Sequence, residues 1–375
     1  MTITEKLLAE LIVLRSVNPA FLPAGHPDTG EQRVADFLAA KAAKAGLSIE
    51  MREVLPGRSN FLARLEPPGR MRQRILLAPH LDTVNGSPAQ FAPKRQGDRL
   101  YGRGACDTKG CIASMLLAVC ELAQLSRRPK HTEIVFAGLV DEENTQAGSR
   151  ALVKEKFKAD LAIVGEATRL KVVTAHKGSL WLKLTTKGRS AHGSRPELGI
   201  NAVHEMAKVV ALLETTYARS LSSRRHPVVG RPTVSVGTIC GGTQANIIPD
   251  ACVITVDRRT IPGETTRKVC AELEAMVRRA GLRASVEEVK LASCIPMETD
   301  PTQPLVAQFM RSVRQTKPVG VNYFCDASVL AEGGIPSVVF GPGDIAQAHT
   351  ADEWISMKSL NRATEMLISF LRSLP

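Results

Sequence analysis

Three apolar segments in the first half of the chain have the length of buried strands, and a segment with helical periodicity stands between each pair. The strand-like segments are Ile75–Ala78, Ile134–Val140 and Leu161–Val164, and the helical ones are Thr108–Leu125 and Gly148–Phe157. A chain that alternates strands and helices in this way buries its strands between layers of helices. We therefore predict an α/β domain with a mostly parallel sheet.

The middle of the chain has a different order, in which two strands follow each other without a helix between them. The expected elements are Ser179–Thr186, Gly199–Tyr217, Thr233–Ile239, Cys252–Asp257, Thr265–Ala280 and Ala284–Val289. Their βαββαβ order is typical of the ferredoxin-like fold, which can stand as a domain of its own. Since α/β character resumes afterwards, we predict a discontinuous domain, residues 1–177 and 290–375, with a second domain inserted at 178–289.

Acidic residues and one histidine lie where the first strands end and where the first helix begins. They are His80, Asp82, Asp107, Glu142, Glu143 and Glu166. Because the carboxyl ends of parallel strands meet at one edge of a sheet, these side chains should crowd one crevice. Two like charges ~4 Å apart repel by about 4 kcal/mol at an effective dielectric constant of about 20, so this many carboxylates need cations among them. Carboxylate and imidazole donors without thiolate suit two divalent ions such as Zn, Co or Mn.

The composition disfavours several other kinds of protein. The net charge is +12, but aromatic residues make up only 4% and the paired arginines are scattered, which disfavours a nucleic-acid-binding protein. A solvated basic surface with a mild preference for anionic substrates accounts for the charge. No apolar run approaches the ~18 residues of a membrane span. Because Glu5, Lys6 and Glu10 interrupt the apolar residues at the N-terminus, we expect no secretory signal, no membrane contact and a cytoplasmic location.

Eight blocks, in order along the chain, form a more specific pattern. Five surround the acidic residues: His80-Leu-Asp82, Gly102-Arg-Gly-Ala-Cys-Asp107, Asp141-Glu-Glu143, Val164-Gly-Glu166 and Ala348-His349-Thr-Ala-Asp-Glu353. Three lie in the inserted domain: Gly188-Arg-Ser-Ala-His192, Gly241-Gly-Thr-Gln-Ala-Asn246 and Asp257-Arg-Arg259. Together they resemble the motifs of the acetylornithine deacetylase, succinyl-diaminopimelate desuccinylase and glutamate carboxypeptidase superfamily of dinuclear zinc amidohydrolases and exopeptidases. This resemblance implies a zinc-exopeptidase-like catalytic domain with an inserted lid and dimerisation domain.

The resemblance also implies roles for single residues. Two divalent ions, most readily zinc, would be held by Asp107 as the bridge, by His80 and Glu166 on one ion, and by Glu143 and His349 on the other. Glu142 would be the general base that generates a metal-bridging hydroxide from water. Asp82 would orient the His80 ring from behind, and His192 of the partner subunit would stabilise the oxyanion.

Substrate contacts are implied for a further group of residues. Asn246 and Arg258 resemble family residues that contact the substrate carboxylate or the oxyanion, with Arg259 as the alternative to Arg258. Gly341 and Gly343 have no side chains, so their backbone N–H groups either form a small anion-binding nest or belong to a simple turn. The lid of the family supplies dimer contacts, so a homodimer is implied.

The choice of substrate depends on smaller details. Ala175-His-Lys-Gly178 and the segment from Gly341 to His349 resemble acetylornithine deacetylases, whereas Cys325-Asp-Ala327 resembles the other branches and leaves the role of Asp326 open. We predict hydrolysis of the amide bond of an N-acyl amino acid. The alternative is a glutamate-carboxypeptidase-like exopeptidase or dipeptidase acting on short peptides. A more remote alternative is a metal- or peptide-binding module without catalysis, but the pattern lacks neither the base nor a ligand.

Overall fold

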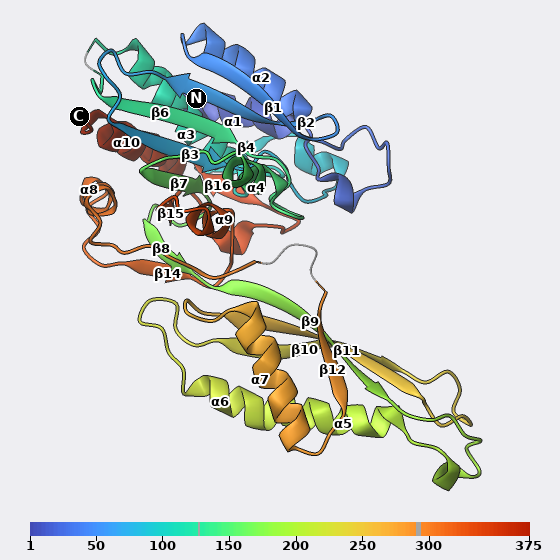
Figure 1. Cartoon of the computed structure of the whole chain (residues 1–375). Coiled ribbons are helices and arrows are strands. Elements are labelled where there is room, and N and C mark those ends of the chain that lie inside the picture. Colours follow the sequence, from blue (N-terminus) through green and yellow to red (C-terminus); the bar gives the residue numbers. More distant parts are fainter. Residues whose placement is uncertain (127, 290–293) are drawn as a thin grey trace. The chain divides into compact units, whose positions relative to one another are not determined.

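The computed structural model describes residues 1–126, 128–289 and 294–375, which form two compact units (Figure 1). The first unit comprises Met1–Thr174, Glu298–Val319 and Cys325–Pro375, and the second comprises Ala175–Met297 and Gly320–Phe324. The second unit thus starts at Ala175 rather than at residue 178, and it includes five residues from the later part of the chain. The expected boundary at residue 290 lies outside the described residues.

A mixed sheet forms the centre of the first unit. Its main strands, in spatial order, are β1 (Ser48–Leu55), β2 (Arg58–Leu65), β6 (Thr132–Gly138), β3 (Gln73–Pro79), β7 (Leu161–Gly165) and β15 (Ser337–Val339). The four central strands, from β6 to β15, are parallel as predicted, whereas β1 and β2 pair antiparallel. Every residue of β6 is buried, which explains its uninterrupted apolar sequence, because helices cover both faces of a parallel sheet.

Shorter strands extend or accompany this sheet. They are β8 (Val173–His176), β13 (Met297–Glu298) and β14 (Val319–Val321) beyond β15, and a separate three-stranded sheet of β4 (Lys94–Gln96), β5 (Arg99–Tyr101) and β16 (Trp354–Ser356). The antiparallel pairing of β8 with β15 completes the mixed character of the central sheet.

The helices of the first unit contact the sheet and one another. They are α1 (Ile3–Val13), α2 (Gln32–Lys44), α3 (Lys109–Gln124), α4 (Ala147–Lys154), α8 (Pro304–Ser312), α9 (Ala327–Glu332) and α10 (Met357–Arg372). The core includes apolar residues of α1, α3 and α10, and α3 contacts both of the others. No helix among the described residues combines the length and apolar character that crossing a bilayer requires.

A buried lysine at the start of α3 donates hydrogen bonds to carbonyl groups at the C-terminal end of α1. The Lys109 ammonium donates to the carbonyl oxygens of Leu11 and Leu14, at 2.9 and 2.7 Å. Helix α1 has no basic residue in its last turn, so Lys109 supplies the donors that its free carbonyls need. Burial lowers the pKa of Lys109 to about 7.

The second unit is a four-stranded antiparallel sheet with helices. Its elements along the chain are β9 (Gly178–Lys187), α5 (Ala202–Leu212), α6 (Ala218–Ser222), β10 (Thr233–Gly241), β11 (Ala251–Thr260), α7 (Thr266–Arg279) and β12 (Ala284–Glu288). The spatial order is β10-β11-β9-β12, which is the ferredoxin-like arrangement. Alternate residues of β11 are buried against the helices, as expected for a sheet with one covered face.

Candidate metal centre

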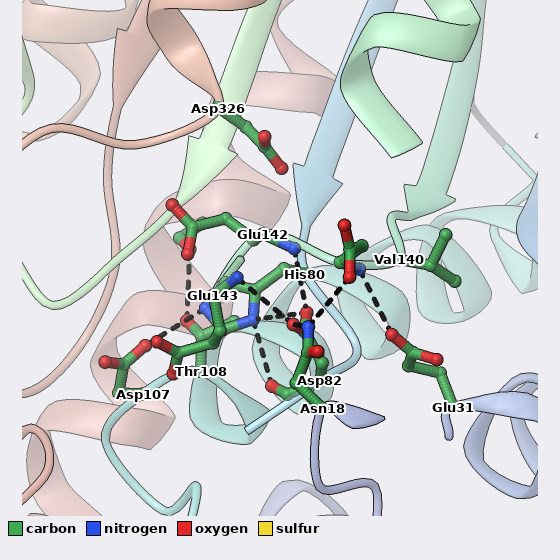
Figure 2. Close-up of polar contacts among 12 residues, drawn as sticks. Asn18, Glu31, His80, Asp82, Asp107, Thr108, Val140, Glu142, Glu143 and Asp326 are labelled. Atoms are coloured by element: carbon green, nitrogen blue, oxygen red, sulfur yellow. Dashed lines mark hydrogen bonds and ion pairs between the residues drawn. The ribbon is translucent and has the colours of Figure 1, made fainter. Parts of the chain in front are cut away.

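Residues from distant segments of the first unit meet at the carboxyl ends of β3, β6 and β7 (Figure 2). His80 Nε2 lies 3.0 Å from Oδ1 of Asp107 and 3.8 Å from Oε1 of Glu166. His349 Nε2 lies 3.2 Å from Oδ2 of Asp107 and 3.2 Å from Oε2 of Glu143. Asp107 therefore presents one carboxylate oxygen to each histidine, as a bridging ligand must.

Two groups of three potential ligand atoms can be drawn in this cluster. One group is His80, Asp107 and Glu143, and the other is His80, Glu142 and Glu166. Within each group the atoms lie within 4.8 Å of one another. Their imidazole nitrogens and carboxylate oxygens fit a divalent ion of the zinc, cobalt or manganese kind.

The electrostatics of the cluster indicate a need for positive charge. Burial, together with the neighbouring carboxylates, raises the pKa of Glu142 and of Glu166 well above the usual range. Hydrogen bonds to Asp107 and Glu143 raise the pKa of His349 to about 10. Burial alone would raise the pKa of Asp107, but hydrogen bonds from the two histidines outweigh it and lower that pKa. Divalent cations would replace these protons and relieve the repulsion among the carboxylates.

Asp82 is fully buried and supports both His80 and the adjacent loop. Its Oδ1 lies 3.3 Å from Nδ1 of His80, on the opposite side of the ring from Asp107. Its two oxygens also accept the backbone N–H groups of Glu142 and Glu143, each at 3.1 Å. Asn18 donates to the same carboxylate at 2.7 Å. Asp82 thus holds the backbone that carries Glu142 as well as the His80 ring, and the sequence had suggested only the second role.

Glu353 organises the loop that carries Asp107. Its carboxylate accepts the backbone N–H groups of Gly104, Cys106 and Asp107 at 2.8–3.0 Å. Arg103 pairs with it at 2.7 Å, and both side chains are buried. The sequence includes Glu353 in the block of His349, but nothing in the local pattern indicates a contact with a loop so far away in the chain.

Asp326 lies near the cluster. Oδ1 accepts a hydrogen bond from Ser149 at 2.6 Å, and Oδ2 is buried without a hydrogen-bond partner among the described residues. Burial raises the pKa of Asp326 to about 6, and its negative charge contributes to the raised pKa of Glu142. Figure 2 shows the carboxylate on the same side of the cluster as Glu142.

Gly341 and Gly343 do not form the anion-binding nest that we considered. The N–H of Gly341 donates to Thr168 Oγ1 at 3.0 Å, and that of Gly343 donates to Ser359 Oγ at 3.4 Å. A Cβ atom at Gly341 would lie 2.5 Å from the carbonyl oxygen of Glu166. Both N–H groups are occupied within the chain, which argues against the nest, and Gly341 is needed because the chain packs closely around it.

The expected lid residues all lie in the second unit, and one of them is an interior residue. Arg258 is 0% exposed, and its guanidinium donates to Tyr217 Oη at 3.1 Å and to Glu264 at 2.6 Å. It cannot contact a substrate while it makes these bonds, which corrects the expectation for Arg258. Successive residues of a strand point to opposite faces, so Arg259 lies on the other face, paired with Asp257 at 3.0 Å.

His192 and Asn246 lie side by side at the surface of the second unit. A β-bridge joins His192 to Ile247, and the N–H of Gly193 donates to the carbonyl of Asn246 at 2.7 Å. His192 is partnered by Ser194 Oγ at 2.8 Å.

Comparison with known proteins gives a consistent result. Residues 76–373 match the model of peptidase family M20/M25/M40. The chain is 31% identical to an acetylornithine deacetylase of Vibrio atlanticus over 357 residues, which cover 92% of both chains. It is also 31% identical to an acetylornithine deacetylase of Myxococcus xanthus, covering 88% of this chain and 89% of the relative.

Solved structures resemble the fold at lower sequence identity. An aminopeptidase of Bacillus cereus superposes with a TM-score of 0.80 at 21% identity, covering 99% of this chain and 97% of that one. A metallo-carboxypeptidase of the M20 family from Sulfolobus solfataricus gives a TM-score of 0.77 at 19% identity, covering 99% of each chain. The α/β fold class predicted from the sequence is confirmed.

Proposed function

Because this chain belongs to peptidase family M20/M25/M40 and is a hydrolase of amide or peptide bonds, we propose that it deacylates an N-acyl amino acid. The observation that carries the proposal is the position of Glu142, a half-buried carboxylate with an oxygen within 4.8 Å of the ligand atoms of His80 and Glu166. Relatives named acetylornithine deacetylase match the chain over about nine tenths of its length, which favours a deacylase over an exopeptidase.

The proposal includes two bound divalent cations, of which zinc is the first choice. Asp107 would be the ligand that both ions share, His80 and Glu166 would hold one ion, and Glu143 and His349 would hold the other. When bound, such ions lower the pKa of water and polarise the amide carbonyl. Glu142 takes the proton of the attacking water and returns it to the leaving amine, while Asp82 keeps the His80 ring and the Glu142 backbone in place.

A hydrolysis assay tests the proposed substrate class. The purified protein is assayed with acetylornithine, succinyl-diaminopimelate, acyl-glutamates and dipeptides, before and after treatment with a chelator. We expect hydrolysis of an N-acyl amino acid that the chelator abolishes and Zn²⁺ restores. If the protein hydrolysed dipeptides in preference to N-acyl amino acids, it would be an exopeptidase rather than a deacylase. Hydrolysis that continued after complete removal of metal would contradict the metal-dependent mechanism.

Arg259 replaces Arg258 as the proposed contact for a substrate carboxylate, because it lies on the face of β11 away from the helices. The variant Arg259→Gln should raise KM for substrates with a free carboxylate by about 10- to 100-fold, the value of a charge-assisted hydrogen bond. Lys183→Gln, on the neighbouring strand β9, is the matched control and should leave KM unchanged. If both substitutions raised KM by the same factor, Arg259 would act only through its contribution to the general surface charge.

A homodimer formed through the second unit is also part of the proposal. Its edge strand β10 and the nearby loops expose Ile200, Ile239 and Ile247, at 50%, 58% and 37%, a surface suited to association. His192 then acts in the site of the partner subunit. Mixing His192→Ala with Glu142→Ala subunits should restore about a quarter of the wild-type activity, because half of the dimers gain one complete site. No recovery after verified subunit exchange would count against action in trans.

A further inference from the structure

The loop that carries Glu142 starts with an unusual backbone conformation. Asp141, which follows strand β6, has a φ of 67°, in the left-handed region that residues with a side chain rarely adopt. Its side chain is 1% exposed. A conformation of this kind persists only where the surroundings enforce it, so the contacts of Asp141 determine the course of the chain into Glu142.

Three residues from the N-terminal part of the chain, Asn18, Glu31 and Arg58, contact Asp141. Glu31 accepts the backbone N–H of Asp141 at 3.1 Å. Arg58 Nη2 lies 2.9 Å from Oδ1 of the Asp141 carboxylate. Glu31 and Arg58 thus hold the amide and the side chain of Asp141, and Asn18 and Thr145 add further hydrogen bonds to its carboxylate.

Glu31 and Arg58 also bind each other through two parallel hydrogen bonds, with Arg58 Nε 2.7 Å from Oε2 of Glu31. Glu31 is wholly buried, and 12% of the Arg58 side chain is exposed. Glu31 occupies the position before α2 where a side chain usually caps the helix, yet its carboxylate makes no capping bond. The carboxylate is instead committed to Arg58 and to Asp141.

Together with Asp82, this pair fixes three successive peptide groups. The N–H of Asp141 is accepted by Glu31, and those of Glu142 and Glu143 are accepted by Asp82. Among the described residues, neither Glu31 nor Arg58 forms a hydrogen bond or ion pair with a proposed metal ligand. Their influence on the reaction therefore passes through Asp141: along the backbone of residues 141–143, and through Asn18, whose side-chain amide donates to the carboxylates of both Asp141 and Asp82.

We infer that the Glu31–Arg58 ion pair positions the general base Glu142 by holding Asp141 in its left-handed conformation. The inference rests on the proposed function, in which Glu142 transfers the proton. A catalytic group displaced by about 1 Å can lose roughly two orders of magnitude in rate, so the pair governs kcat rather than substrate binding. Both are positioning residues, because among the described residues their side-chain hydrogen bonds and ion pairs go to each other and to Asp141, and none goes to Glu142 or to a proposed metal ligand.

The variant Arg58→Met tests this inference, with Arg74→Met as its matched control. Arg74 also pairs with a buried carboxylate, Glu133, on the same sheet, but at the start of the parallel strands, away from their carboxyl ends. For the folded, metal-loaded protein, Arg58→Met should lower kcat by about 10- to 100-fold, with KM and bound metal unchanged. Arg74→Met should lower the melting temperature but keep the wild-type kcat.

Two conservative variants decide the matter if Arg58→Met does not fold. Arg58→Lys keeps the charge but loses the two-bond geometry, and Glu31→Gln keeps the size but loses the charge, so both should lower kcat to intermediate values. A wild-type kcat in both, or a loss of bound metal in step with kcat, overturns the inference. If Glu142→Gln is inactive while these variants are normal, only this inference fails, whereas full activity of Glu142→Gln would refute the proposed role of Glu142 itself.

Discussion

Replacing Glu142 with Gln should lower kcat by about 10²- to 10⁴-fold, the usual contribution of a general base. The amide has the size of the carboxylate but cannot accept the proton of the attacking water. The backbone N–H of residue 142 remains bonded to Asp82, so the loop should keep its conformation. Steady-state kinetics and the metal content per chain measure the two parts of this prediction.

The metal content also separates two possible roles of Glu142. Because Glu142 lies within ligand distance of His80 and Glu166, it could itself hold an ion. In that case Glu142→Gln would bind less metal than the wild type. Glu143→Gln serves as the comparison, since removal of a proposed ligand should lower metal content and activity together. An inactive Glu142→Gln variant with full metal content supports the role of base.

Replacing Glu353 with Gln should weaken both the fold and the metal site. The neutral amide leaves the buried charge of Arg103 without its partner, which costs about 3–5 kcal/mol in the free energy of unfolding. Its NH₂ group would also face backbone N–H donors of the loop that ends at Asp107. Since Asp107 is the proposed bridging ligand, metal affinity should fall by about 10- to 100-fold.

Denaturant unfolding and metal titration of Glu353→Gln test these two effects. Glu365→Gln is the control, because Glu365 pairs with Arg362 at the surface, where such pairs contribute about 0–1 kcal/mol. If Glu353→Gln had the stability and metal affinity of the wild type, Glu353 would not organise the Asp107 loop.

The centre of the fold could be predicted because local patterns encode it. The segment Ile134–Val140 is apolar throughout and leads into Asp141, which identifies a strand buried on both faces and the edge at which it ends. The same reasoning placed Glu166 after β7 and His80 after β3. The family resemblance inferred from these blocks is confirmed by the match to peptidase family M20/M25/M40.

The predicted strand was shorter than β11, and for this reason the sequence did not show which face carries Arg258. The expected strand ended at Asp257, whereas β11 continues to Thr260. Continued alternation places Arg258 on the buried face with Ile254 and Val256, so a longer strand would have revealed its interior position. Gly341 is different, because the crowding by Glu166 that requires a glycine there arises only from the packing of separate segments.

The amino-acid sequence alone determined the order of strands and helices and the set of acidic residues at the strand ends, because periodicity and strand direction are local properties. Only the tertiary structure decided which residues hold those acidic groups in place. Arg103 and Glu353 stand 250 positions apart in the chain, and Glu31 and Asp141 stand 110 apart. Contacts over such separations depend on how whole helices and strands pack together, and no local pattern carries that information.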